Sequence, residues 1–193
     1  IEVRKDYAKE MVTGFIKLNG ITVGAIGNRL AVIEEENVIA EFDGSLTTSG
    51  CNKAERFVKF CNAFNIPILT LTNVTGYKGT IEEENTIALA SAKLTHAFIN
   101  ANVPKINVIV GKAYGSAYVT MNSKHIGADM VFAFEHTKIG MMDSHLAAKI
   151  MYGGSPELIS EKANEYEETQ SVISAAKRGY VDTIIESESI RKH

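Results

Sequence analysis

The residues whose types and spacing suit chemistry are the small ones in the stretch GKAYGSAY, at residues 111–118. An apolar run that predicts a buried strand ends directly before this stretch, and an amphipathic run that predicts a helix follows it. Small residues at a strand-to-helix turn leave backbone N–H groups uncovered at the positive end of the helix, where they suit a developing oxyanion. Spacing alone favours a second interpretation, in which Gly115, Ser116 and Ala117 are small only to let helix and strand pack closely.

A second glycine-containing loop, VTGYKGT at residues 74–80, also follows a predicted strand and precedes a predicted helix. The backbone around Gly76 and Tyr77 is therefore placed to face a ligand. The loop does not have the spacing of a phosphate-binding loop, because neither Lys-Ser nor Lys-Thr follows its second glycine. Taken alone, such a segment is more often a plain connection.

Metal and hydrolase chemistry have little support in the sequence. The five histidines show no H-x-x-x-H spacing, so no metal site is expected. Ser144 lies between Asp143 and His145, which are the residue types of a hydrolase triad. Neighbours in sequence seldom form a triad, however, and the chain has no nucleophile-elbow motif.

The elements that must position these residues alternate between apolar runs and helix-period stretches, which predicts an α/β fold. Helices are expected at residues 53–64, with Asn52 as N-cap, and at residues 82–100 and 156–177. The predicted strands are residues 23–27, 68–72, 106–110, 131–134 and 138–141, with another around Leu46. Periodicity fits both a ββα superhelix of crotonase type and a doubly wound sheet.

The bulk properties exclude several classes of protein. The 193 residues predict one domain, 1–193, and a net charge of −3 with scattered cations argues against nucleic-acid binding. No apolar stretch approaches the ~20 residues of a membrane span. Cys51 and Cys61 give neither a disulfide framework nor a zinc pattern, so a cytoplasmic location is expected. The chain opens on Ile1 without an initiator Met, which suggests that it was trimmed from a longer chain.

Four segments, taken in order, resemble the C-terminal, biotin-side carboxyltransferase domain of propionyl-CoA carboxylase β subunits and their biotin-dependent decarboxylase relatives. They read EMVTGFIKLNGITVGAIGN (10–28), KAERFVKFCNAFNIPILTLT (53–72), KAYGSAYVTMNSKHIGA (112–128) and AAKRGYVDTIIESESIR (175–191). Four ordered matches are far more specific than one glycine turn. They outweigh the interpretation of residues 111–118 as a packing turn.

The resemblance implies a crotonase-like fold and transfer of a carboxyl group between carboxybiotin and the α-carbon of an acyl-CoA. It implies that the N–H groups of Ser116 and Ala117 hold the ureido oxygen of biotin, and that Gly115, Gly76 and Tyr77 contact this cofactor. The implied substrate is a coenzyme A thioester. The implied partners are a biotin carboxyl carrier protein and a CoA-binding carboxyltransferase domain or subunit, within an oligomer to which a helix near residues 87–101 is a candidate contact.

Departures from the family pattern leave a second hypothesis open. The loop at residues 74–79 lacks both prolines of the family's loop, and Ser116 stands where the family usually has Gly. The run MDSHL at residues 142–146 replaces Met-Gly-Pro-Glu-Gly, which predicts an altered path at a helix start that normally faces the site. A non-catalytic scaffold module is therefore the alternative. A crotonase-type hydratase or isomerase ranks last, because it would want a positioned acid–base carboxylate.

Overall fold

The computed structural model describes residues 1–153 and 156–190, and its centre is a seven-stranded sheet. The strand order is β1-β2-β6-β8-β9-β11, with β10 pairing to β8. Only β1 and β2 pair antiparallel within this sheet. The bounds are β1 Met11–Leu18, β2 Ile21–Asn28, β6 Ile68–Val74, β8 Lys105–Tyr114, β9 Met130–Phe134, β10 Lys138–Gly140 and β11 Thr183–Ile185.

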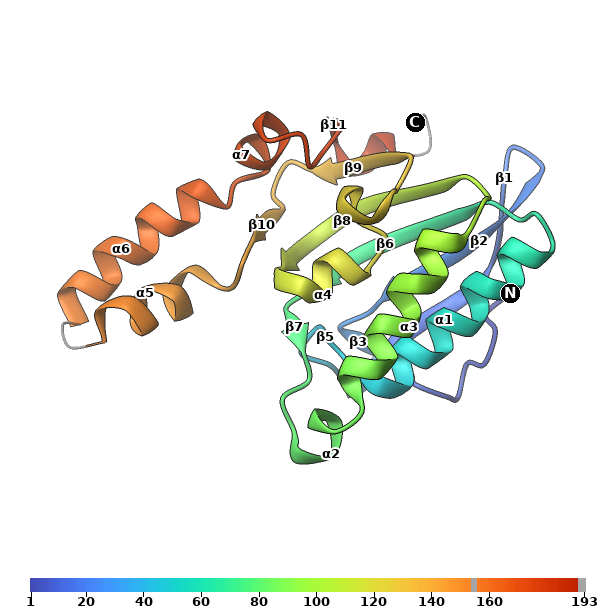
Figure 1. Ribbon diagram of the computed structural model, residues 1–193, viewed down its shortest axis with the longest axis horizontal. Coiled ribbons are helices and arrows are strands. Elements are labelled where there is room, and N and C mark those ends of the chain that lie inside the picture. The colour runs from blue at the N-terminus through green and yellow to red at the C-terminus, as the bar shows by residue number, and fades with distance from the viewer. Residues whose placement is uncertain (154–155, 191–193) are drawn as a thin grey trace.

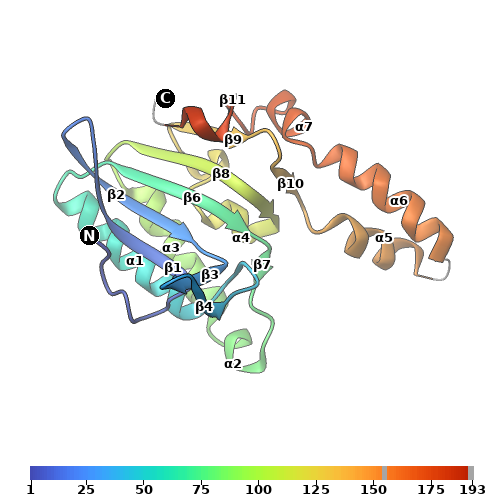
Figure 2. The ribbon, with the colours of Figure 1, turned by 180° about the vertical axis from the view of Figure 1, so that it is seen from behind.

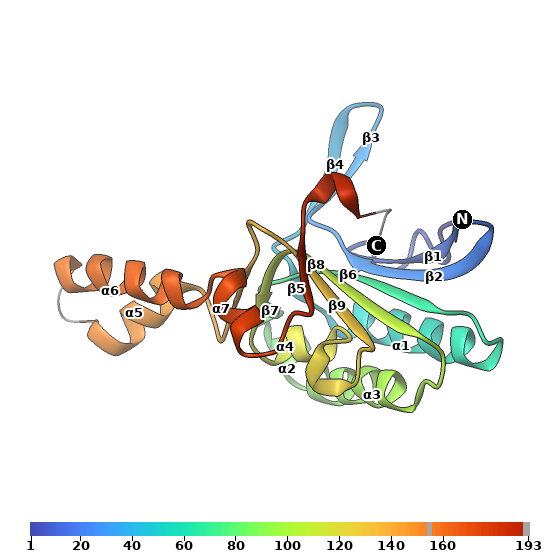
Figure 3. The same cartoon turned by 90° about the horizontal axis from the view of Figure 1, so that it is seen from above.

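The strands follow one another across the sheet in sequence order, which decides between the two predicted architectures. When the order of the strands runs one way across a sheet, right-handed crossovers place all connecting helices on one face. Helices α1 (Thr48–Ala63), α3 (Ile87–Asn100) and α4 (Gly115–Thr120) do lie on one side of the sheet (Figures 1 and 3). A doubly wound sheet reverses its order and carries helices on both faces, so that alternative is wrong.

Helix α1 begins earlier than the sequence pattern predicts. Its N-cap is Thr47, whose hydroxyl accepts the N–H of Gly50 at 2.9 Å, and Asn52 lies in the second turn. The prediction of Asn52 as N-cap is therefore wrong. A threonine cap satisfies a first-turn N–H that would otherwise lack a partner. The buried face carries both cysteines, which are free thiols.

Two helices that periodicity predicts as continuous are each broken in two. Residues 82–100 divide into α2 (Ile81–Glu84) and α3, and the Glu83 carboxylate accepts the N–H of Thr48 at the start of α1 at 2.6 Å. Residues 156–177 divide into α6 (Pro156–Thr169) and α7 (Val172–Lys177). Between them, the carbonyl of the buried Gln170 accepts the N–H of Ile139 at 2.8 Å. Each break thus lies beside a hydrogen bond to a residue distant in the sequence.

Several short elements surround the sheet, and β5 among them is the strand predicted around Leu46. The remaining bounds are β3 Ala31–Glu34, β4 Asn37–Glu41, β5 Ser45–Leu46, β7 Gly76–Tyr77, α5 Ser144–Tyr152, η1 Lys124–Ile126 and η2 Ser187–Ser189. Helices α5 and α6 form a hairpin that projects away from the sheet (Figures 1 and 2). No helix in the described part of the chain is both long and apolar enough to cross a bilayer.

The main core lies between the sheet and the layer formed by α1 and α3. Ile26 and Ile109 from the sheet, with Leu94 and Phe98 from α3, are at most 1% exposed. A smaller apolar cluster built on Val108, Phe132 and Ile185 covers part of the sheet separately. The core thus fixes β6 and β8 from the helix side, and these two strands lead into the turns described next.

Candidate functional site

Asn73, near the end of β6, shapes the turn that leads from β8 to α4. The register of the two strands shifts between Thr72 and Val74, and Asn73 Oδ1 accepts the N–H of Lys112 at 2.8 Å. A Cβ atom at Gly111 would lie only 2.4 Å from this Oδ1. Glycine at 111 is therefore required by close approach, and the irregularity directs the end of β8 toward α4.

The start of α4 presents uncapped backbone donors. Gly115 has a φ of +60°, and a Cβ there would lie 3.0 Å from the carbonyl of Met141. No side chain caps the helix. Within the described residues, the N–H groups of Ser116 and Ala117 donate to no other group of the chain, as expected for the first turn of a helix. Ser116 is exposed, whereas the Ala117 side chain is packed inside.

Tyr77 lies directly beside α4. Its hydroxyl donates to the carbonyl oxygen of Ser116 at 3.2 Å and lies 2.7 Å from the hydroxyl of Thr120, which also accepts from Thr95 at 3.2 Å. A Cβ atom at Gly76 would meet no atom within 4 Å, so that side of the loop is open. The structure thus brings the predicted loop residues to the predicted donor residues.

Asp43 anchors the loop that carries Tyr77. Its carboxylate pairs with Lys78 at 2.6 Å and accepts the backbone N–H of Ser45 at 3.0 Å, and its carbonyl accepts from the Thr75 hydroxyl at 3.0 Å. Hydrogen bonds from Lys78 and Ser45 hold the pKa of Asp43 well below its usual range. These contacts constrain a loop that lacks the prolines of the family pattern. The sequence gives no signal for Asp43, because its partners in the loop lie 32 and 35 residues away.

The altered run at residues 142–146 still starts a helix. The Asp143 carboxylate accepts the N–H groups of His145 at 3.1 Å and Leu146 at 3.2 Å, so α5 begins at Ser144. A helix therefore starts here without the Gly and Pro of the family pattern, because aspartate is a strong N-cap. The capping carboxylate is that of Asp143, the only acid that a triad with Ser144 and His145 would use. Pairing of β10 with β8 then places Met141 against Gly115.

A fully buried polar cluster lies behind α4 and was not anticipated. Asn107 Oδ1 accepts from the hydroxyls of Thr70 (3.0 Å) and Thr72 (2.8 Å). Asn122 Nδ2 donates to Thr70 Oγ1 at 3.2 Å and to the carbonyl of Ile106 at 3.3 Å. Asn122 has a φ of +52°, a conformation that asparagine tolerates better than most residues. The cluster fixes the end of α4 to β6 and β8.

Two tyrosines flank the site, and neither ionises near neutral pH. Burial raises the pKa of Tyr114, with Asp143 and Glu167 adding to the effect, and burial also raises the pKa of Tyr118. Both phenols are therefore neutral at pH 7. Within the described residues no group of three or more His, Cys, Asp or Glu side chains is placed to hold a metal ion. The groups in this region that can stabilise negative charge are the backbone N–H donors of Ser116 and Ala117.

Comparisons with known proteins show which family the chain resembles. The model of the carboxyl transferase domain family matches residues 1–193. The propionyl-CoA carboxylase β chain of Roseobacter denitrificans is 39% identical over 99% of this chain, and the mitochondrial β chain of Mus musculus is 40% identical over 98%. These matches cover 37% and 34% of the two relatives, so the chain spans little more than a third of their length.

Solved structures show the same architecture. The transcarboxylase 12S hexamer, with methylmalonyl-CoA bound, matches all of this chain and 36% of its own with a TM-score of 0.91 and 34% identity. The β subunit of Pseudomonas aeruginosa geranyl-CoA carboxylase has a TM-score of 0.86 at 22% identity, which supports the fold alone. The neighbours are carboxyltransferases of the crotonase-like fold, so the predicted fold class is confirmed. The chain belongs to the carboxyl transferase domain family.

Proposed function

We propose that this chain is the biotin-side half of a biotin-dependent acyl-CoA carboxyltransferase, which moves a carboxyl group between carboxybiotin and the α-carbon of an acyl-CoA. The observation that carries the proposal is the pair of unused N–H donors of Ser116 and Ala117 at the start of α4. Membership of the carboxyl transferase family and the likeness to transcarboxylase 12S support it.

We place the ring of biotin against the residues around the start of α4. Biotin, when bound, supplies a ureido group that carries the transferred carboxyl. The N–H groups of Ser116 and Ala117 donate to the oxygen on which negative charge develops, and each such preorganised donor is worth about 3–4 kcal/mol in a transition state. Gly115 gives the backbone its left-handed turn into the helix, while Gly76 and Tyr77 form the side of the approach.

The proposed partners supply the binding site for the acyl-CoA and the biotin itself. A CoA-binding carboxyltransferase domain, outside residues 1–193, holds the acyl-CoA thioester, and a biotin carboxyl carrier protein delivers biotin. Leu89 and Ile99 are 62% and 55% exposed on α3, which supports this helix as a contact within an oligomer. We place residues 1–193 as one domain of a cytoplasmic enzyme, although some relatives are mitochondrial.

The decisive variant is Ser116→Pro, which deletes one donor at a first-turn position where proline is tolerated. In an assay of carboxyl transfer with the CoA-binding partner and carboxybiotin, we expect the rate to fall roughly 100-fold or more. Ser116→Ala keeps the N–H group and is the matched control. Without the partner, the chain should show no transfer.

Biotin binding separates this function from a scaffold role. Titrating biotin into ¹⁵N-labelled chain should shift the amide signals of Ser116 and Ala117, and Ser116→Pro should lose the response. A chain that gives no response at millimolar biotin, with unchanged transfer in Ser116→Pro, would refute the proposal and favour the scaffold. Turnover by the chain alone would refute the need for a CoA-binding half.

A further inference from the structure

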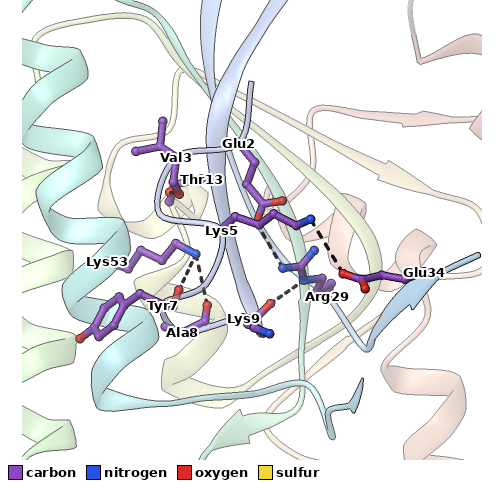
Figure 4. Close-up of polar contacts among 10 residues, drawn as sticks. All are labelled: Glu2, Val3, Lys5, Tyr7, Ala8, Lys9, Thr13, Arg29, Glu34 and Lys53. Carbon is purple, nitrogen blue, oxygen red and sulfur yellow. Dashed lines mark hydrogen bonds and ion pairs between the residues drawn. The ribbon is translucent and has the colours of Figure 1, made fainter. Parts of the chain in front are cut away.

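A lysine side chain is buried on α1 with no carboxylate beside it. Lys53 is 1% exposed, and its Nζ donates to the backbone oxygens of Tyr7 at 2.7 Å and Ala8 at 3.3 Å (Figure 4). The two carbonyls satisfy two of its three N–H groups but bring no negative charge. A buried ammonium is costly to retain unless an anion offsets it.

The acids nearest to this ammonium are already engaged. Glu2 pairs with Arg29 at 3.2 Å, and Glu10 accepts a hydrogen bond from the hydroxyl of Thr47. Figure 4 shows Glu2 directed at Arg29, with the ammonium of Lys53 facing the carbonyls of the N-terminal segment. Burial is the main cause that lowers the pKa of Lys53, and Glu2 and Glu10 oppose it. The described residues therefore leave this cation without an ion-pair partner.

A cavity of about 170 Å³ opens beside Lys53. Its aromatic wall is formed by Phe15, Phe57 and Phe60, and Arg4 and Arg56 also line it. An apolar cavity of ~150 Å³ is large enough to hold a benzene ring. The cavity is therefore the right size for one small ring or a short branched chain.

Two further cationic side chains lie where this cavity adjoins a larger one. Arg4 and Arg56 also line an adjoining cavity of about 800 Å³, whose other lining residues are Lys5, Asp6, Tyr7, Asn52 and Lys93. In the described part of the chain, neither guanidinium group forms a hydrogen bond or an ion pair. An aromatic cavity, a buried ammonium and two unengaged guanidinium groups thus meet in a protein whose net charge is −3.

We propose that this cavity binds a small organic carboxylate, with its apolar body against the three phenylalanine rings and its carboxylate held by Arg4, Lys53 and Arg56. A guanidinium fork matches the two oxygens of a carboxylate, and each charge-assisted hydrogen bond is stronger than a neutral one. The cavity shares no lining residue with the region around Ser116, so the site is independent of the biotin-side function.

The test is a titration of ¹⁵N-labelled chain with benzoate, followed by amide NMR. We expect saturable shifts at Phe15, Phe57 and Phe60 with a Kd of about 1 mM, a normal affinity for so small a ligand. Benzyl alcohol has the ring without the charge, and inorganic phosphate has the charge without the ring. Each should bind at least roughly tenfold more weakly than benzoate.

Arg56→Gln is the main variant, because its side chain is exposed and the described structure shows no contact that the fold would lose. We expect benzoate to bind roughly tenfold more weakly to this variant. Lys17→Gln is the matched control, since it removes one exposed cation that lines neither cavity. The proposal is overturned by the absence of saturable shifts at the three phenylalanines, by equal binding of benzyl alcohol or phosphate, or by unchanged affinity in Arg56→Gln.

Discussion

Replacing Tyr77 by phenylalanine tests whether the loop positions the donor peptide. The variant removes one hydroxyl and leaves the ring, so it deletes the hydrogen bond to the Ser116 carbonyl (3.2 Å) and the contact with Thr120 (2.7 Å). Thr120 keeps its bond from Thr95, which limits the cost. At about 1 kcal/mol for each hydrogen bond, unfolding should become easier by about 1–2 kcal/mol.

Tyr77→Phe should slow function while the variant remains folded at working temperature. If the hydroxyl holds the Ser116 peptide in place, losing about 1.4 kcal/mol of alignment slows carboxyl transfer roughly tenfold, with the loss in kcat. Urea unfolding measures the first quantity, and transfer with the CoA-binding partner measures the second. Tyr152→Phe is the control, because the Tyr152 hydroxyl makes no hydrogen bond within the described residues. A fully folded Tyr77→Phe protein with unchanged kcat would refute the positioning argument.

Three further predictions concern the turn, the loop and the helix start. Gly111→Ala should destabilise the chain by about 1–3 kcal/mol in urea unfolding, because its Cβ would meet Asn73 Oδ1 at 2.4 Å; an unchanged midpoint would contradict the close approach. The pKa of Asp43 is lowered on folding, so its stabilising effect is complete above its ordinary pKa of 3.8 and is lost as the pH falls below it. Asp43→Asn should therefore make the free energy of unfolding less sensitive to acid. We expect the difference to be under about 1 kcal/mol, because the pair with Lys78 is about half exposed. Ser116→Gly keeps the donor and clears the approach, so biotin should bind several-fold more tightly at a cost in stability of about 1 kcal/mol; weaker biotin binding would show that the serine side chain assists.

The sequence predicted those features that depend on local periodicity. The strands expected at residues 68–72, 106–110 and 131–134 are all present, because buried parallel strands are short apolar runs that need no partner to be visible. The Gly115 turn was visible as well, since small residues between a strand and a helix have few other uses. The oxyanion role that we propose for it rests on family resemblance, because spacing alone favours packing.

What the sequence missed depends on contacts between distant residues. No residue near Glu83 in the sequence indicates that its carboxylate will accept the N–H of Thr48 at the start of α1. The helical pattern around Glu83 also continues across the point where α2 ends and α3 begins. Asn73 and Asp43 shape the site through partners more than 30 residues away. A polar residue in an apolar strand, such as Asn107, was the one local signal that could have pointed to the buried cluster.

The hairpin of α5 and α6 is joined to the sheet by few polar contacts. Two of them join β10 to the end of α6: the Ile139 N–H donates to the Gln170 carbonyl at 2.8 Å, and Lys138 pairs with Glu167 at 2.7 Å. The Gln170 side chain donates to the Met142 carbonyl, at the start of the hairpin, at 2.8 Å. We expect such an arm to open as one cooperative unit while the sheet stays folded, so its amides should exchange with solvent earlier than those of β6 and β8. Gln170 thus ties both ends of the hairpin to the strand whose next residue, Met141, lies against Gly115.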